Sequence, residues 1–135
     1  MNLSIISRRG LLPMAVVAAL LLLLGASDAS AQLGACRCPN VTVRNQAHCE
    51  VVLVLQGSSE TQLVVPANSK GSFLCQPGLN VLVQDCQGRL HPLELGVCVD
   101  VVLAEGCCTR VCLEEVARGC YQVVVYPPVV DCHCQ

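Results

Sequence analysis

Aromatic residues are almost absent from this sequence. Its 135 residues include one Phe, two Tyr and no Trp. Aromatic rings are the usual platforms on which sugars and nucleic-acid bases stack, so the composition argues against binding either of them by stacking. A core must instead be built from Val and Leu, whose burial stabilises a fold by about 1.5–3 kcal/mol per side chain.

Charged residues are also scarce, at 13% of the chain. Without the first 31 residues, six basic and nine acidic residues remain, which gives a formal charge of −3. A nucleic-acid partner needs a basic surface for its phosphates, and a membrane-active peptide needs a basic amphipathic helix. The sequence offers neither, and we expect no nucleic-acid partner.

The first 31 residues have the pattern of a secretory signal peptide. Arg8 and Arg9 form the charged region, Leu11–Leu24 the apolar region, and a small-residue Ala-Ser-Ala site ends the segment. We therefore predict a signal peptide at 1–31 and a secreted, extracellular domain at 32–135. The apolar stretch is shorter than the span of about 20 residues that crosses a bilayer, so we expect no membrane span in the mature chain. A retained signal anchor is the alternative.

All twelve cysteines lie in the predicted mature domain. They are Cys36, Cys38, Cys49, Cys75, Cys86, Cys98, Cys107, Cys108, Cys112, Cys120, Cys132 and Cys134. So many cysteines in a short secreted chain are typical of a disulfide scaffold, and we predict six bridges. The sequence leaves the pairing open. Our working hypothesis pairs Cys75 with Cys86 across a hairpin, and Cys120 with Cys132.

Metal binding is the other use of clustered cysteines. Zinc sites usually present their ligands as pairs separated by two to four residues, whereas this chain has C-x-C at Cys36 and Cys38 and again at Cys132 and Cys134. In a strand, both cysteines of C-x-C share one face and the intervening His133 points away. A redox enzyme would need an exposed C-x-x-C pair, which the sequence lacks. We therefore expect no metal and no cofactor.

Valine-rich runs separated by turn residues are typical of β-strands. The predicted strands are Val41–Arg44, Cys49–Leu55, Thr61–Val65, Gly71–Cys75, Leu79–Gln84, Leu93–Leu103, Tyr121–Tyr126 and Val129–Cys132. Strands of this length and spacing predict an all-β, disulfide-rich domain, built as an antiparallel β-sandwich or barrel.

One segment departs from the strand pattern. Thr109 is a capping-type residue, apolar residues follow at helical spacing, and Gly119 comes just after the segment. We predict one short helix near residues 109–118.

Isolated polar motifs suggest one modification and no catalysis. The Asn-Val-Thr sequence at Asn40 is an N-glycosylation acceptor in a eukaryotic host. His48, His91 and His133 lie far apart without a partnered motif, and we interpret each as a surface or structural histidine. No nucleophile elbow is present. We predict a protein that is not an enzyme, with no catalytic residues.

The cysteines near the C-terminus resemble a known pattern. Cys108-x-x-x-Cys112 followed by Cys132-x-Cys134 is similar to the ring-forming cysteines of cystine-knot growth factors. The match covers about a fifth of the chain. Two features depart from it: Arg110 replaces the usual Gly, and the gap between the motifs is short. The resemblance implies a signalling ligand in which Cys108 and Cys112 pair with Cys132 and Cys134 or with an early cysteine.

These observations predict a secreted, non-enzymatic binding or structural protein that displays loops to an extracellular protein partner. A cystine-knot-like ligand is one alternative. A protease inhibitor that presents a rigid loop, such as Asn68–Gly71 or Gln76–Asn80, is another. Low charge and abundant Val and Leu are also compatible with self-association through an exposed edge strand.

Overall fold

The computed structural model describes residues 32–129 and 131–135. The predicted signal peptide, residues 1–31, lies outside the described residues. Those described form an all-β domain without a helix. Its strands are β2 (Asn40–Asn45), β3 (Val51–Gln56), β4 (Glu60–Val65), β5 (Ser69–Leu74), β6 (Asn80–Gln84), β7 (Leu90–Pro92), β8 (Cys98–Ala104), β9 (Cys107–Ala117) and β10 (Cys120–Val125).

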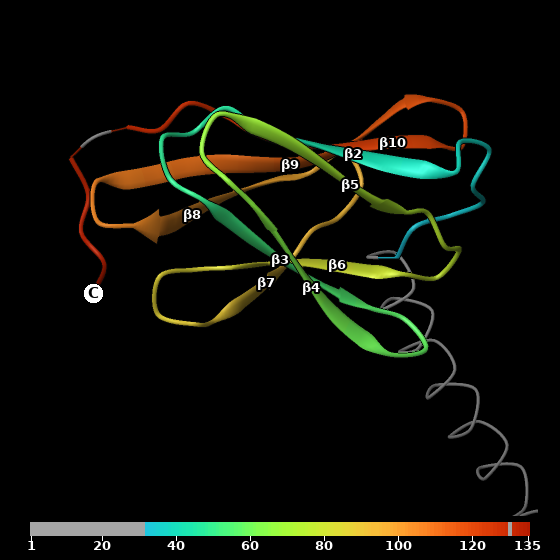
Figure 1. The fold of residues 1–135 in the computed structure, drawn as a ribbon, viewed down its shortest axis with the longest axis horizontal. Helices are drawn as coiled ribbons and strands as arrows, with labels where there is room; N and C mark the ends of the chain where they lie inside the picture. Colours follow the sequence, from blue (N-terminus) through green and yellow to red (C-terminus); the bar gives the residue numbers. More distant parts are fainter. Residues whose placement is uncertain (1–31, 130) are drawn as a thin grey trace, which may run out of the picture. The chain divides into compact units, whose positions relative to one another are not determined.

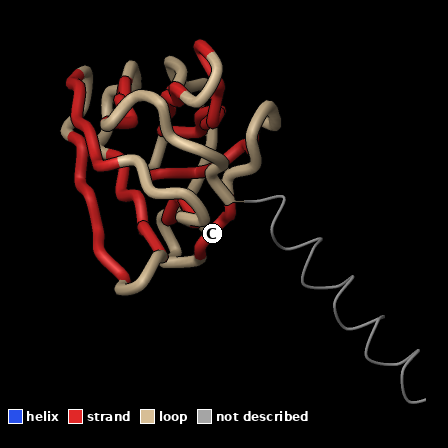
Figure 2. The backbone as a smooth tube through the Cα atoms, turned by 90° about the vertical axis from the view of Figure 1, so that its right-hand side faces the viewer, coloured by secondary structure: helices blue, strands red, loops and turns tan. Residues whose placement is uncertain are grey.

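The strands form two open sheets in a sandwich-like arrangement, as Figures 1 and 2 show. One sheet has the strand order β5-β2-β10-β9-β8 and the other has the order β4-β3-β6-β7. Every pairing is antiparallel except that of β2 with β10, which is parallel. The prediction of an all-β fold with two sheets is thus confirmed, and a closed barrel is not formed.

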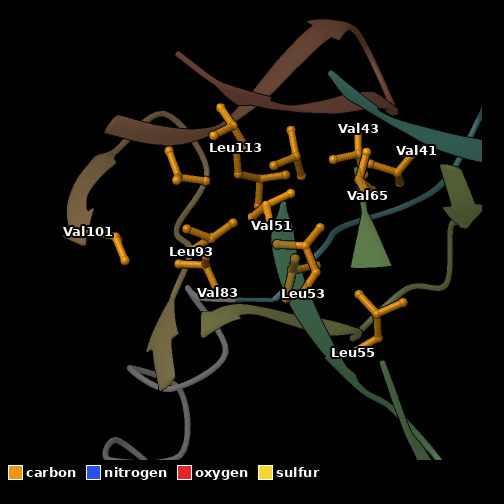
Figure 3. Close-up of a cluster of buried hydrophobic side chains, with 14 of the residues drawn as sticks. Val41, Val43, Val51, Leu53, Leu55, Val65, Val83, Leu93, Val101 and Leu113 are labelled. Atoms are coloured by element: carbon orange, nitrogen blue, oxygen red, sulfur yellow. The ribbon is translucent and has the colours of Figure 1, made fainter. Parts of the chain in front are cut away.

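Valine and leucine side chains from both sheets meet in a single core, shown in Figure 3. β2 illustrates how the sequence produces it, because Val41 and Val43 are fully buried whereas Thr42 and Arg44 are exposed. This is the two-residue alternation of a strand with one face on the core. The longest fully buried side chains, Leu53, Leu93 and Leu113, come from different parts of the chain.

The predicted helix at 109–118 is wrong, because this segment belongs to β9. Val111 and Leu113 are buried in the core on one face of the strand. Arg110, which lies between the buried residues Thr109 and Val111, is exposed on the other face. Gly119, read as a helix cap, has a φ of +75° in the turn between β9 and β10. Pairing of this segment with β8 and β10 therefore outweighs the helical spacing of its apolar residues.

Two other predicted strands are shorter than expected. Leu93–Leu103 contains β8 only from Cys98, because the preceding residues connect the two sheets with Gly96 at a φ of +78°. Of Val129–Cys132, the described residues 129, 131 and 132 contribute one isolated bridge, between Val129 and Cys108. β7, a three-residue strand that ends at Pro92, was not predicted.

Candidate functional site

All twelve cysteines are joined in six disulfides, as the composition predicted. The pairs are Cys36–Cys75, Cys38–Cys120, Cys49–Cys107, Cys86–Cys134, Cys98–Cys112 and Cys108–Cys132. The working pairs Cys75–Cys86 and Cys120–Cys132 are wrong. Cys75 comes directly after β5 and Cys86 follows β6. These strands lie in different sheets, so the two residues do not face each other across a hairpin.

The bridges also differ from the pairing that a cystine-knot ring implies. Cys108 bonds Cys132, which fits that pattern, but Cys112 bonds Cys98 across the β8–β9 pair. Cys134 bonds Cys86 in the β6–β7 turn. The ring expected from the resemblance is therefore not closed.

The described residues of the C-terminal segment after β10, 126–129 and 131–135, are here called the tail and are bonded to both sheets. Cys132 bonds β9 and Cys134 bonds the β6–β7 turn. The backbone N–H of Val129 donates to the carbonyl of Cys108 at 2.8 Å, and that of Gly106 donates to the carbonyl of Cys132 at 3.0 Å. The tail therefore has a fixed course beside β9.

A groove of about 700 Å³ lies between the tail and the outer face of β8 and β9. The core uses Val99, Val101 and Leu103 of β8 and Val111 and Leu113 of β9. Because side chains alternate along a strand, their neighbours face the groove. These are Cys98, Asp100 and Val102 of β8, Cys108, Arg110 and Cys112 of β9, and Tyr126, Pro127 and Val129 of the tail.

The groove is mostly apolar with one ion pair in it. Arg110 and Asp100 are register partners, and Nε of Arg110 lies 3.1 Å from Oδ1 of Asp100. Both side chains are exposed, at 62% and 77%, so the pair contributes little stability. A ligand could therefore replace the Arg110–Asp100 ion pair with contacts of its own at little cost in free energy.

Tyr126 is fixed at the edge of the groove. Its backbone N–H donates to the carbonyl of Arg110 at 3.0 Å, its own carbonyl accepts a hydrogen bond from the Thr109 hydroxyl, and its phenol donates to Glu114 Oε2 at 3.1 Å. The bond to Glu114 and the negative charge of that carboxylate raise the pKa of Tyr126. The phenol is therefore protonated at neutral pH and orients the ring.

A second polar cluster surrounds Asp85, which comes directly after β6 and is 8% exposed. Its carboxylate accepts bonds from His91 Nε2 at 2.9 Å and from the backbone N–H groups of Gln87 and Arg89 at 2.9 and 2.8 Å. These bonds, with that from His91 the largest cause, lower the pKa of Asp85 to about 2. The cluster stabilises the β6–β7 turn. Both carboxylate oxygens of Asp85 already accept hydrogen bonds within the domain.

The third histidine supports the tail. His133 Nδ1 pairs with the Glu105 carboxylate, which also accepts the backbone N–H of Cys134 at 3.1 Å. The bond from His133 is the main cause that lowers the pKa of Glu105. His91 and His133 thus both bond carboxylates, whereas His48 is exposed. In residues 32–129 and 131–135, no group of three His, Cys, Asp or Glu side chains is placed to hold a metal ion.

The two segments considered as inhibitory loops occupy different settings. Asn68, with a φ of +53°, forms the turn before β5, and Ser69–Gly71 already belong to that strand. In Gln76–Asn80, the first four residues lie between β5 and β6, with Gly78 at a φ of +83°, and Asn80 begins β6. No signal in the sequence had indicated the groove, since its lining residues become neighbours only through the β8–β9 register and the tail bridges.

Comparison with protein-family models, curated proteins and solved structures yields no match to this chain. Across the described part of the chain, no helix has the length and apolar character needed to cross a membrane.

Proposed function

We propose that this protein is a secreted, non-enzymatic binding protein that receives an apolar segment of an extracellular protein partner in the β8–β9–tail groove. Six disulfides in a domain of this size are typical of secreted proteins. The observation that carries the proposal is the groove itself, whose far wall is held by two bridges.

Size and chemistry both favour this function. The volume of about 700 Å³ is within the range of about 300–1,000 Å³ typical of sites that bury a ligand. Val102, Val129 and the Tyr126 ring supply apolar contact, and the Arg110–Asp100 pair can bond a peptide backbone. Because disulfides fix both walls, little conformational entropy is lost on binding.

Selection of phage-displayed peptides on the oxidised protein tests this function. Val129 is 70% exposed on the groove wall, whereas Val64 is 48% exposed on β4 in the other sheet. We expect the selected peptides to share an apolar anchor and to bind Val129→Asp at least roughly tenfold more weakly, since burying an unpaired charge is costly. Val64→Asp is the matched control and should bind as the unchanged protein does.

Peptides that bind Val129→Asp as tightly as the unchanged protein would contradict the groove as the site. Self-association through an edge strand gives a different result, because Val64→Asp on the edge strand β4 would then change the size-exclusion profile. Turnover of a small substrate by the purified protein would contradict a non-enzymatic role.

A further inference from the structure

Two of the few basic side chains lie directly opposite each other at one edge of the five-stranded sheet. Arg44 of β2 and Lys70 of β5 are register partners, and both side chains are exposed. They lie on the face that points away from the core, since Val43 and Asn45 on either side of Arg44 are buried. Lys70 is also the only lysine of the sequence.

Like charges directly opposite each other on a sheet destabilise it unless something compensates them. Among the described residues, neither Arg44 nor Lys70 forms an ion pair, and the four ion pairs of the domain involve other residues. An otherwise acidic domain therefore presents an uncompensated pair of cations at this edge.

The surroundings of the pair are also suited to an anion. Arg44 and Lys70 border a hollow of about 200 Å³, together with Gln46, Asn68, Ser69 and Asn45, so its lining contains no carboxylate. The backbone beneath is fixed, because the N–H of Asn68 donates to the carbonyl of Ala47 at 3.0 Å. The Asn45 amide and the Ser69 hydroxyl donate to backbone carbonyls within the domain. Two cations and the side-chain amides of Gln46 and Asn68 thus border one small space.

The geometry points to a binding site for a single tetrahedral oxyanion, a phosphate or sulfate monoester, held between Arg44 and Lys70. Three acceptor oxygens match the planar donors of a guanidinium and the point charge of an ammonium. A hollow of about 200 Å³ is smaller than most sites for whole small molecules, so the anionic group alone enters it. The formal charge of −3 disfavours a long polyanion.

This site is separate from the groove and does not depend on the proposed function. In the strand order of the sheet, β5 and β2 lie at the opposite end from β8 and β9. A failure of either proposal therefore leaves the other intact.

Titration with inorganic phosphate, followed by the amide signals of the ¹⁵N-labelled oxidised protein, tests the site against chloride at equal ionic strength. We expect saturable shifts confined to the residues around Arg44, Gln46, Asn68 and Lys70. Because each cation would form charge-assisted hydrogen bonds to the anion, Arg44→Gln or Lys70→Gln should weaken binding roughly tenfold or more. Arg118→Gln, which removes the same charge from another exposed position, should not.

The single lysine provides a second readout. Phosphate at the site should slow acylation of Lys70 by an N-hydroxysuccinimide ester, as measured by peptide mass spectrometry, and Arg44→Gln should abolish this protection. O-phosphoserine and tyrosine O-sulfate then distinguish a phosphate source from a sulfate source, since the natural group binds more tightly than the inorganic ion. Shifts that do not saturate, or equal weakening by Arg118→Gln, would overturn the proposal.

Discussion

Nδ2 of Asn45 lies 3.2 Å from the carbonyl oxygen of Val65, so the last residue of β2 is bonded to the last residue of β4 in the opposite sheet. The same amide donates to the carbonyls of Cys49 and Pro66 at 2.9 and 3.0 Å, and Oδ1 accepts the N–H of Ala47 at 3.0 Å. Asn45 is only 2% exposed. One buried side chain therefore satisfies the backbone where the chain passes between the sheets.

Replacing Asn45 should destabilise the domain strongly. Asn45→Ala leaves several buried backbone groups without partners, each costing about 1–3 kcal/mol, so we expect a loss of at least about 2 kcal/mol in chemical denaturation. Asn45→Asp places a carboxylate against three carbonyl oxygens, which raises the pKa of the new acid. Its stability should be greatest below about pH 4 and fall as pH rises. Gln46→Glu, at an exposed neighbour, should show no such fall.

Two turn glycines, Gly119 between β9 and β10 and Gly88 between β6 and β7, give a matched pair of substitutions. Gly119 and Gly88 have φ values of +75° and +83°, so Ala costs about 1–2 kcal/mol of backbone strain at either position. A Cβ at Gly119 would also lie 2.6 Å from Cγ and 2.9 Å from N of Arg37, whereas nothing lies within 4 Å at Gly88. Gly119→Ala should therefore lower the free energy of unfolding clearly more than Gly88→Ala. Equal losses would show that the contact with Arg37 is unimportant.

Removing single bridges should have unequal effects. The Cys49–Cys107 bridge closes 58 residues and Cys98–Cys112 closes 14. Loop-closure entropy then gives losses of about 4 and about 3 kcal/mol for the paired Cys→Ala variants. The variant that lacks Cys49–Cys107 should therefore unfold at a lower guanidinium chloride concentration than the variant that lacks Cys98–Cys112. If removal of Cys98–Cys112 lowered the midpoint more, the lost entropy of the unfolded chain would not be the main source of the stabilisation by these bridges.

Asp85 should make the domain acid-sensitive in a defined range. Its pKa is lowered from 3.8 to about 2 in the folded state, so its stabilisation is complete above about pH 4 and is lost as pH falls towards 2. Asp85→Asn should be less stable than the unchanged protein at pH 7, and the difference should shrink between pH 4 and pH 2. A difference that is constant over this range would contradict the bonding of the ionised carboxylate.

Glycosylation of Asn40 is a prediction that expression can test. Asn40 and Thr42 are both exposed on the outer face of β2, where an acceptor site is accessible. Protein secreted from a eukaryotic host should lose mass on treatment with an N-glycosidase. Both Asn40→Gln and Thr42→Ala should abolish this loss, and an unglycosylated secreted product would contradict the prediction.

Strands with regular alternation were predictable, because each residue of β2 from Val41 to Arg44 is assigned to a face by its own polarity. β9 was not, since its cysteines, a threonine and an arginine hide the alternation, and the partners that stabilise it are distant in sequence. The total of six bridges followed from composition, but the pairing did not, because it depends on which sheet receives β5 and β6. The groove and the Arg44–Lys70 pair likewise arise from register, which no local pattern specifies.

The two bridges at each end of the domain determine how it would respond to mechanical tension. A pull applied at Ala35 and Gln135 passes through Cys36–Cys75 and Cys86–Cys134, so only the chain between Cys75 and Cys86 can lengthen along that route. A parallel route passes through Cys38–Cys120. From Cys120 it continues either along the chain to Cys132 or back along the chain to Cys108 and across Cys108–Cys132. Under load the domain should thus behave as a nearly inextensible link until a reductant opens its sulfur bonds.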